Sequence, residues 1–374
     1  MASTEESLKR QCLVGATDII FKMATLEQYW VGKSNPLGRH LMDGDGRDAG
    51  FDHIGHICWD AKRSCLWIAD VHNHCIRQCF VHGFRVLRDH LVQTLRFMSV
   101  DAIIIIVQYL VTNDRAGYVV SATGMDLVGD NDGKEANDGE ARTAKFNKPL
   151  CLVLAPDVLY ISEIGVPRIR AFDLITRMVT TVAGIGVEEA DRKQVDGDKE
   201  NARFHSISGL GVDVDGLFCW DQLFLRRVTF GGNVSPMPFS PFWKDKGTVI
   251  GIVRGLWFFR SNETCNIYEP LTQKLVGCLA CPNHWNSVAC DEPTGDIYVS
   301  DHDGVHCFSP NGDPNNPVTV YKGTMNRHRM QLLLTRVQLY CLALDPIGRF
   351  LFIGDYGMGT IHRITLSWPK AWSG

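Results

Sequence analysis

Leu66-Trp67-Ile68-Ala69-Asp70 is one of seven copies of a short apolar run that ends in a polar residue. The other copies are Tyr109–Asn113, Leu159–Glu163, Leu217–Asp221, Leu256–Arg260, Ile297–Asp301 and Leu351–Asp355. Consecutive copies lie 39 to 58 residues apart, close to the length of one four-stranded blade. We therefore expect an all-β protein, a β-propeller in which each copy is the second strand of a blade. Seven copies favour seven blades, and counts of six or eight stay open.

A loop rich in Gly and Asp precedes three of the copies and ends on a phenylalanine. It runs from Asp43 to Phe51 in the first case, and the corresponding stretches end at Phe146 and Phe204. Such a loop suits the crossing from the outer strand of one blade to the inner strand of the next. We expect its phenylalanine to pack between blades.

Two stretches resemble the NHL-repeat family of β-propellers. Leu66–Arg77 carries Ala-Asp, Asn-His and Ile-Arg pairs that are similar to the family pattern, and Val179–Gly184 is similar to its blade junction. The resemblance covers about residues 26–366 and weakens where Asn113 and Arg260 replace the acid. It implies one propeller domain over residues 26–374, after an N-terminal extension of residues 1–25.

The N-terminal segment also provides a means of closing the ring. Gln28–Gly32 aligns with the outer strand Val179–Gly184 and is expected to supply the outer strand of the C-terminal blade. Closure of this kind removes exposed strand edges, which otherwise invite aggregation.

Strand order predicts which face of the propeller carries function. In a blade of four antiparallel strands, the crossings to the next blade and the turns between second and third strands emerge on the same face, here named the loop face. Binding residues concentrate on loops held by a rigid scaffold, so we expect function there. The recurrent acid at the end of the second strand has a structural interpretation, because Asp readily accepts backbone N–H bonds in turns.

Composition and charge set further bounds. The 374 residues hold 38 Lys and Arg against 42 Asp and Glu, a net charge of −4, which argues against extensive nucleic-acid binding. The first ten residues lack the apolar core of a secretory signal, and the longest apolar run, Ala102–Val107, is far shorter than the roughly 20 residues that span a bilayer. We expect a cytoplasmic monomer with no membrane association. Of the 13 cysteines, Cys278 and Cys281 have C-x-x-C spacing without a second pair nearby, which favours free thiols.

Histidines at the starts of inner strands suggest a metal site. His53, His56, His205 and His284 are expected near the mouth of the central channel, where three neutral imidazoles with an open position could hold zinc. Certain relatives of the NHL fold bind metal in the channel, which implies a metal-dependent lyase or hydrolase as an alternative function. No other cofactor is expected.

A basic cluster suggests a second alternative, RNA binding. Arg327, Arg329 and Arg336 lie in one crossing on the loop face, and Arg168 and Arg170, which follow Glu163, are expected to join them. Some NHL domains are similar in holding RNA on a basic face.

The segment Pro236–Trp243 is the candidate protein-binding site. Its prolines exclude it from a central strand, and Phe239, Phe242 and Trp243 are costly to expose without a partner. No nucleophile elbow or phosphate-binding loop occurs in the sequence. The leading prediction is therefore a non-catalytic propeller scaffold that binds other proteins in an intracellular assembly.

Overall fold

A computed structural model describes most of the propeller. The described residues are 27–31, 44–45, 49–80, 118–121, 137–185, 193–222, 224–237, 248–253, 256–261, 264–269, 274–280, 286–291, 294–301, 304–309, 318–322, 340–345, 349–355 and 359–366.

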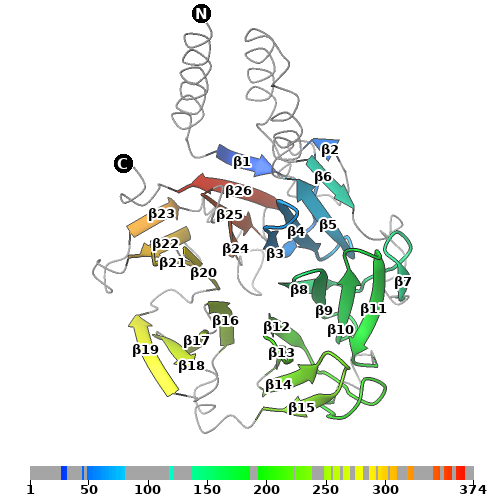
Figure 1. Ribbon diagram of the computed structural model, residues 1–374. Coiled ribbons are helices and arrows are strands. Elements are labelled where there is room, and N and C mark those ends of the chain that lie inside the picture. The colour runs from blue at the N-terminus through cyan, green and yellow to red at the C-terminus, as the bar shows by residue number, and fades with distance from the viewer. Residues whose placement is uncertain are drawn as a thin grey trace, which may run out of the picture.

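Six antiparallel sheets, the blades, are arranged in a ring in this part of the chain, and it contains no helix (Figure 1). Blade one holds β3 (Ile54–Asp60), β4 (Cys65–Asp70), β5 (Cys75–Phe80) and β6 (Tyr118–Ser121). Blade two holds β8 (Pro149–Ala155), β9 (Val158–Glu163), β10 (Arg168–Asp173) and β11 (Met178–Ala183). Blade three holds β12 (Ile207–Val212), β13 (Gly216–Asp221), β14 (Phe224–Thr229) and β15 (Val234–Pro236).

The remaining three blades follow in chain order. Blade four holds β16 (Thr248–Val253), β17 (Leu256–Ser261), β18 (Thr264–Glu269) and β19 (Lys274–Ala280). Blade five holds β20 (Ser287–Asp291), β21 (Asp296–Ser300), β22 (Gly304–Phe308) and β23 (Val318–Lys322). Blade six holds β24 (Tyr340–Asp345), β25 (Phe350–Asp355), β26 (Thr360–Thr365) and β1 (Glu27–Val31). The short β2 (Gly44–Asp45) and β7 (Gly139–Glu140) pair with the outer strands β6 and β11.

The first strand of each blade lines the centre of the ring. These inner strands contact one another in the order β3, β8, β12, β16, β20 and β24, and β24 in turn contacts β3 (Figure 1). The outermost strand of blade six comes from the other end of the chain: β1 pairs antiparallel with β26, with Val31 opposite Ile361.

The preferred count of seven blades is not confirmed, because the described residues form six, the smaller count left open above. The copy Tyr109–Asn113 lies outside the described residues. It falls in the chain between β5 and β6, which pair directly with each other as third and fourth strands of blade one. The chain between β5 and β6 therefore does not supply the second strand of a separate blade among the described residues.

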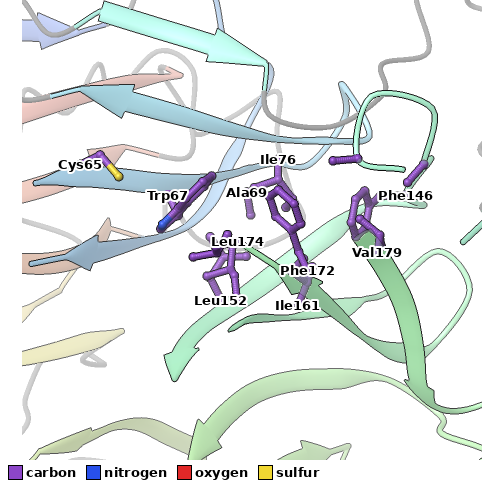
Figure 2. Close-up of a cluster of buried hydrophobic side chains, with 13 residues drawn as sticks. Cys65, Trp67, Ala69, Ile76, Phe146, Leu152, Ile161, Phe172, Leu174 and Val179 are labelled. Carbon is purple, nitrogen blue, oxygen red and sulfur yellow. The ribbon is translucent and has the colours of Figure 1, made fainter. Parts of the chain in front are cut away.

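The hydrophobic core consists of layers between neighbouring blades. Each of the six buried clusters joins side chains of two adjacent blades, including one that joins blade six to blade one. Figure 2 shows the layer between blades one and two, where Trp67 and Phe172 meet edge to face with ring centroids 5.8 Å apart. Every residue of β4 is buried, because a second strand has a neighbouring blade on each side. A continuous apolar run, rather than an alternating one, suits this position.

The described ranges contain no helix of the length and apolarity that a bilayer crossing needs.

Candidate functional site

Three blades carry the same buried clamp on the loop face. In each, the acid that ends the second strand pairs with an arginine of the third strand, and the guanidinium lies 4.8 to 4.9 Å from the ring centroid of the loop phenylalanine. The clamps are Asp70–Arg77–Phe51, Glu163–Arg170–Phe146 and Asp221–Arg226–Phe204. The expectation that these phenylalanines pack between blades is confirmed, since each belongs to a buried cluster shared by two blades.

Strand register explains why the arginine reaches the acid. In blade one, Arg77 lies opposite Ile68, two residues before Asp70 on the same side of β4. In blade three, Arg226 likewise lies opposite Cys219, two residues before Asp221. The arginine is therefore the diagonal cross-strand neighbour of the acid, a position from which long side chains can interact.

The blade-one clamp fixes the crossing that enters the blade. Asp70 Oδ1 accepts the backbone N–H of Asp52 at 2.9 Å, and Asp70 Oδ2 accepts Arg77 Nη1 at 3.2 Å and Asn73 Nδ2 at 2.9 Å. Arg77 also donates to Gly50 O at 2.5 Å. Burial raises the pKa of Asp70 to about 6, and the positive charge of Arg77 opposes that rise. The acid thus accepts a backbone N–H bond, as its repetition predicted, but the donor is Asp52 in the crossing that enters the blade and not the turn after the acid.

Blades two and three use their clamps in the same way. Glu163 Oε1 accepts the N–H of Asn147, and Asp221 Oδ1 accepts the N–H groups of His205 and Ser206 at 2.8 Å each. Arg226 also donates to two crossing carbonyls, those of Arg203 and Val195, at 2.6 Å. The crossings of these blades are therefore held by charged groups and not only by apolar contact.

The other blades vary the clamp. His306 takes the arginine position in blade five, with its Nε2 2.9 Å from Asp301 Oδ2, and His362 takes it in blade six, opposite Ile353. Burial lowers the pKa of His362 to about 4, so this imidazole is neutral. Blade four has Arg260 where the acid would be, and its guanidinium donates to Asn286 Oδ1 at 3.3 Å.

A cluster of ionisable side chains lies above the blade-one clamp. Asp52 and His53 precede β3, and His72 lies in the turn between β4 and β5. The Asp52 Oδ1 atom is 2.5 Å from His53 Nδ1 and 3.5 Å from His72 Nδ1, and the two imidazole centroids are 4.1 Å apart. Hydrogen bonds from both imidazoles, His53 first, hold the pKa of Asp52 well below its usual range.

This cluster corrects the predicted histidine site. His53 lies with Asp52 and His72, while His56 and His205 do not join it in any metal-binding group among the described residues. His284 lies outside the described residues. His56 is on β3, and burial lowers its pKa to about 4. Sequence reasoning missed His72, whose signal was a second histidine immediately before the Asn73-His74 pair of the repeat.

The predicted RNA-binding residues divide in two. Arg170 is fully buried and bound to Glu163, so its assignment to an exposed basic face is wrong. Arg168 is also largely buried and contacts the same carboxylate through Nε. Arg327, Arg329 and Arg336 lie outside the described residues, so RNA binding through them stays a prediction.

The predicted protein-binding residues Phe239, Phe242 and Trp243 also lie outside the described residues. The segment that leads to them is anchored: Met237 N donates to Leu225 O at 3.1 Å, and Met237 packs on the cluster between blades three and four.

An exposed apolar group lies on the loop face beside blade three. Phe224, at the start of β14, is 55% exposed, and Val195 and Ile185 of the adjoining crossing are also exposed. Gln194 Nε2 donates to Asp221 O at 2.8 Å, which ties the residue before Val195 to the β13–β14 turn. These side chains therefore project from backbone that the clamp and the turn hold in place.

Comparison with known proteins supports the fold and goes no further. No family model and no curated protein sequence matches the chain. A protein of unknown function from Bacteroides thetaiotaomicron is similar in structure, with a TM-score of 0.50 and 11% identity over 90% of this chain and 75% of that chain. A chain of the mitotic checkpoint complex (TM-score 0.48, 11% identity, 91% of this chain and 95% of that one) and streptogramin B lyase (0.47, 10%, 92% and 98%) are also similar. At these identities the likeness concerns the fold alone, and the chain is a β-propeller.

Proposed function

We propose that this chain is a divergent NHL-type propeller that acts as a protein-binding scaffold in an intracellular assembly, through the loop face at blade three. The observation that carries the proposal is Phe224, an aromatic side chain 55% exposed on the first residue of β14. Aromatic residues, phenylalanine among them, are enriched in protein interfaces, where a few side chains carry most of the binding energy.

The rigidity of this surface supports a binding role. Val195 forms backbone bonds in both directions with Arg203, at 3.1 and 2.9 Å, and its carbonyl accepts Arg226 Nη2. Phe224 pairs with Asp221 across the turn. Little conformational freedom is left to lose when a partner binds, and such preorganisation increases affinity.

The opposite face offers a matched control. Phe230 is 48% exposed in the β14–β15 turn, at the other end of the same strand as Phe224. Phe224→Ala and Phe230→Ala each remove a phenylalanine ring of similar exposure, from opposite faces. The Phe230 ring also stacks on Tyr160 of blade two, with ring centroids 5.9 Å apart, so the thermal midpoint of each variant is measured before their partners are compared.

The test is quantitative affinity purification of the wild-type chain and both variants, followed by direct binding of each recovered protein to purified propeller. We expect Phe224→Ala to lose at least one direct partner that Phe230→Ala retains, with equal thermal midpoints. Identical partner sets and affinities for all three chains would refute a docking role for this surface. A Phe239→Ala/Trp243→Ala variant tests the neighbouring segment in the same way.

A further inference from the structure

Asp52, His53 and His72 bring metal-ligating side chains together at a place that the proposed protein-binding surface does not include. The side chains come from two segments, the crossing before β3 and the turn after β4. They offer one carboxylate oxygen and two imidazole nitrogens, all within 4.8 Å of one another. Two histidines and one carboxylate on one side of an ion form a recurrent site for divalent transition metals.

Backbone hydrogen bonds hold the two segments together. Val71 N donates to His53 O at 3.0 Å and His72 N donates to Asp52 O at 3.1 Å. The N–H of Asp52 is held by Asp70, which the clamp fixes. The candidate ligands therefore stand on preorganised backbone, as metal sites require.

The equivalent place in blade two shows that the fold does not impose this cluster. Ile164 N donates to Lys148 O and Gly165 N donates to Asn147 O, the same pair of backbone bonds. Asn147, Lys148 and Gly165 thus stand where Asp52, His53 and His72 stand in blade one. His53 and Lys148 share a left-handed backbone, with φ of 63° and 53°, so this conformation is common to the two blades. Of the two blades, only blade one carries a carboxylate and two imidazoles at these positions.

Distances and exposure both allow an ion to enter. Tetrahedral coordination at about 2.0–2.1 Å places neighbouring donor atoms about 3.3 Å apart, so the present separations need shifts of roughly 1 Å. The side chains of Asp52, His53 and His72 are 18, 35 and 38% exposed. Three protein ligands at a half-exposed site leave coordination positions for water or for a ligand from solution.

We propose that Asp52, His53 and His72 form a binding site for a divalent transition-metal ion of the Zn²⁺ class on the loop face of blade one. Asp52 supplies the anionic ligand and the two imidazoles supply nitrogen. The metal retains open positions toward solvent. This site lies apart from Phe224, so its test is independent of the scaffold proposal.

The experiment uses the full chain carrying Cys278→Ser, which removes an exposed thiol that would compete for metal. Co²⁺ is the probe, because its absorption spectrum separates nitrogen and oxygen ligands from thiolate. Equilibrium dialysis gives the stoichiometry and affinity, and Zn²⁺ competition follows. The variants are His72→Gln and His53→Asn, the latter because Asn tolerates a left-handed backbone. His205→Asn is the control, since His205 takes the place of Asp52 in blade three.

We expect one Co²⁺ per chain, without a thiolate signature and displaceable by Zn²⁺. Affinity should fall by more than about 100-fold in each site variant, because loss of even an outer partner of a ligand costs roughly 10- to 100-fold. The control should bind as the parent does. Absence of uptake by the parent chain overturns the proposal, and so does uptake that both site variants retain. Equal thermal midpoints in chelator establish that each variant is folded.

Discussion

Arg226 and Arg227 are adjacent on β14 and permit a direct test of what the clamps contribute. Arg226 is 3% exposed and stacks over Phe204 at 4.8 Å, while Arg227 is 21% exposed and stacks over Phe218 at 5.0 Å. Arg226 pairs with buried Asp221 and with Asp196, which is 44% exposed, and Arg227 pairs with Asp213. The substitutions Arg226→Met and Arg227→Met keep an unbranched side chain against each ring and remove the charge.

The expected losses follow from the surroundings of the two charges. Arg226→Met leaves Asp221, which is fully buried, without its counter-charge and removes donors from two crossing carbonyls. Removing one partner of a buried ion pair typically costs about 3–5 kcal/mol. Arg227 binds Asp213 through both oxygens, at 2.8 and 2.7 Å, but Asp213 is 38% exposed, and exposed pairs contribute about 0–1 kcal/mol.

Denaturant titration followed by tryptophan fluorescence measures both losses, with the free-energy difference taken from the shift in midpoint at constant slope. A third chain, Asp221→Asn/Arg226→Met, should recover part of the loss, because a neutral amide needs no counter-charge and its oxygen can still accept the N–H of His205. Equal losses in the two single variants would refute the argument that the buried clamp holds the crossing. Further destabilisation of the double variant would refute the argument from uncompensated charge.

Three further outcomes are expected. Gly232→Ala should lower the free energy of unfolding by at least about 2 kcal/mol, because φ at this residue is +88° and a Cβ would lie 2.3 Å from Val182 O. Gly231→Ala is the control: the nearest neighbour of its Cβ would lie at 3.8 Å, so it should change the same titration little. His362 has a folded pKa of about 4 against 6.5, so the unfolded chain binds more protons between these values. This histidine should contribute up to about 3 kcal/mol to the stability that the wild type loses as the pH falls from 6.5 to 4, and His362→Gln should lose less in pH-dependent titrations. Alkylation of the folded protein, read by mass spectrometry, should modify exposed Cys278 quickly and buried Cys65, whose thiol pKa burial raises to about 12, only after unfolding; equal rates would contradict the buried-thiol interpretation.

The sequence predicts strands better than it predicts their partners. Six of the seven apolar runs correspond to second strands, as in β9, which begins one residue before the predicted run at Leu159. The run Tyr109–Asn113 has the same composition, but composition reports that a strand is suited to burial and does not say which strand it pairs with. Only the pairing of β5 with β6 shows that the strands on either side of this run belong to the same blade.

The clamp arginines illustrate a relation that the sequence contained but that spacing alone concealed. Arg77 follows Asp70 by seven residues, whereas Arg226 follows Asp221 by five. The difference arises because β5 begins five residues after the acid and β14 only three. Counted from the start of the third strand, both arginines are the third residue. The two arginines therefore occupy the same position in their strands, although they follow the acid at different distances along the chain.

The histidine cluster could not be predicted from one repeat, because its members become neighbours only through the bonds between a crossing and a turn. The same bonds occur in blade two, where the three positions are occupied by Asn147, Lys148 and Gly165. A Cβ at Gly165 would lie 1.8 Å from Asn147 Oδ1, so the amide of Asn147 fills the space that a side chain at position 165 would take. In blade one, His72 occupies the position of Gly165 and lies beside Asp52. The side chain at this position is therefore a candidate metal ligand in blade one and is absent in blade two. Because the clamp beneath fixes the backbone in both cases, the side chains above it are free to differ between blades. Blades with a similar backbone can therefore carry different side chains on the loop face, as in the candidate metal site on blade one and the exposed Phe224 on blade three.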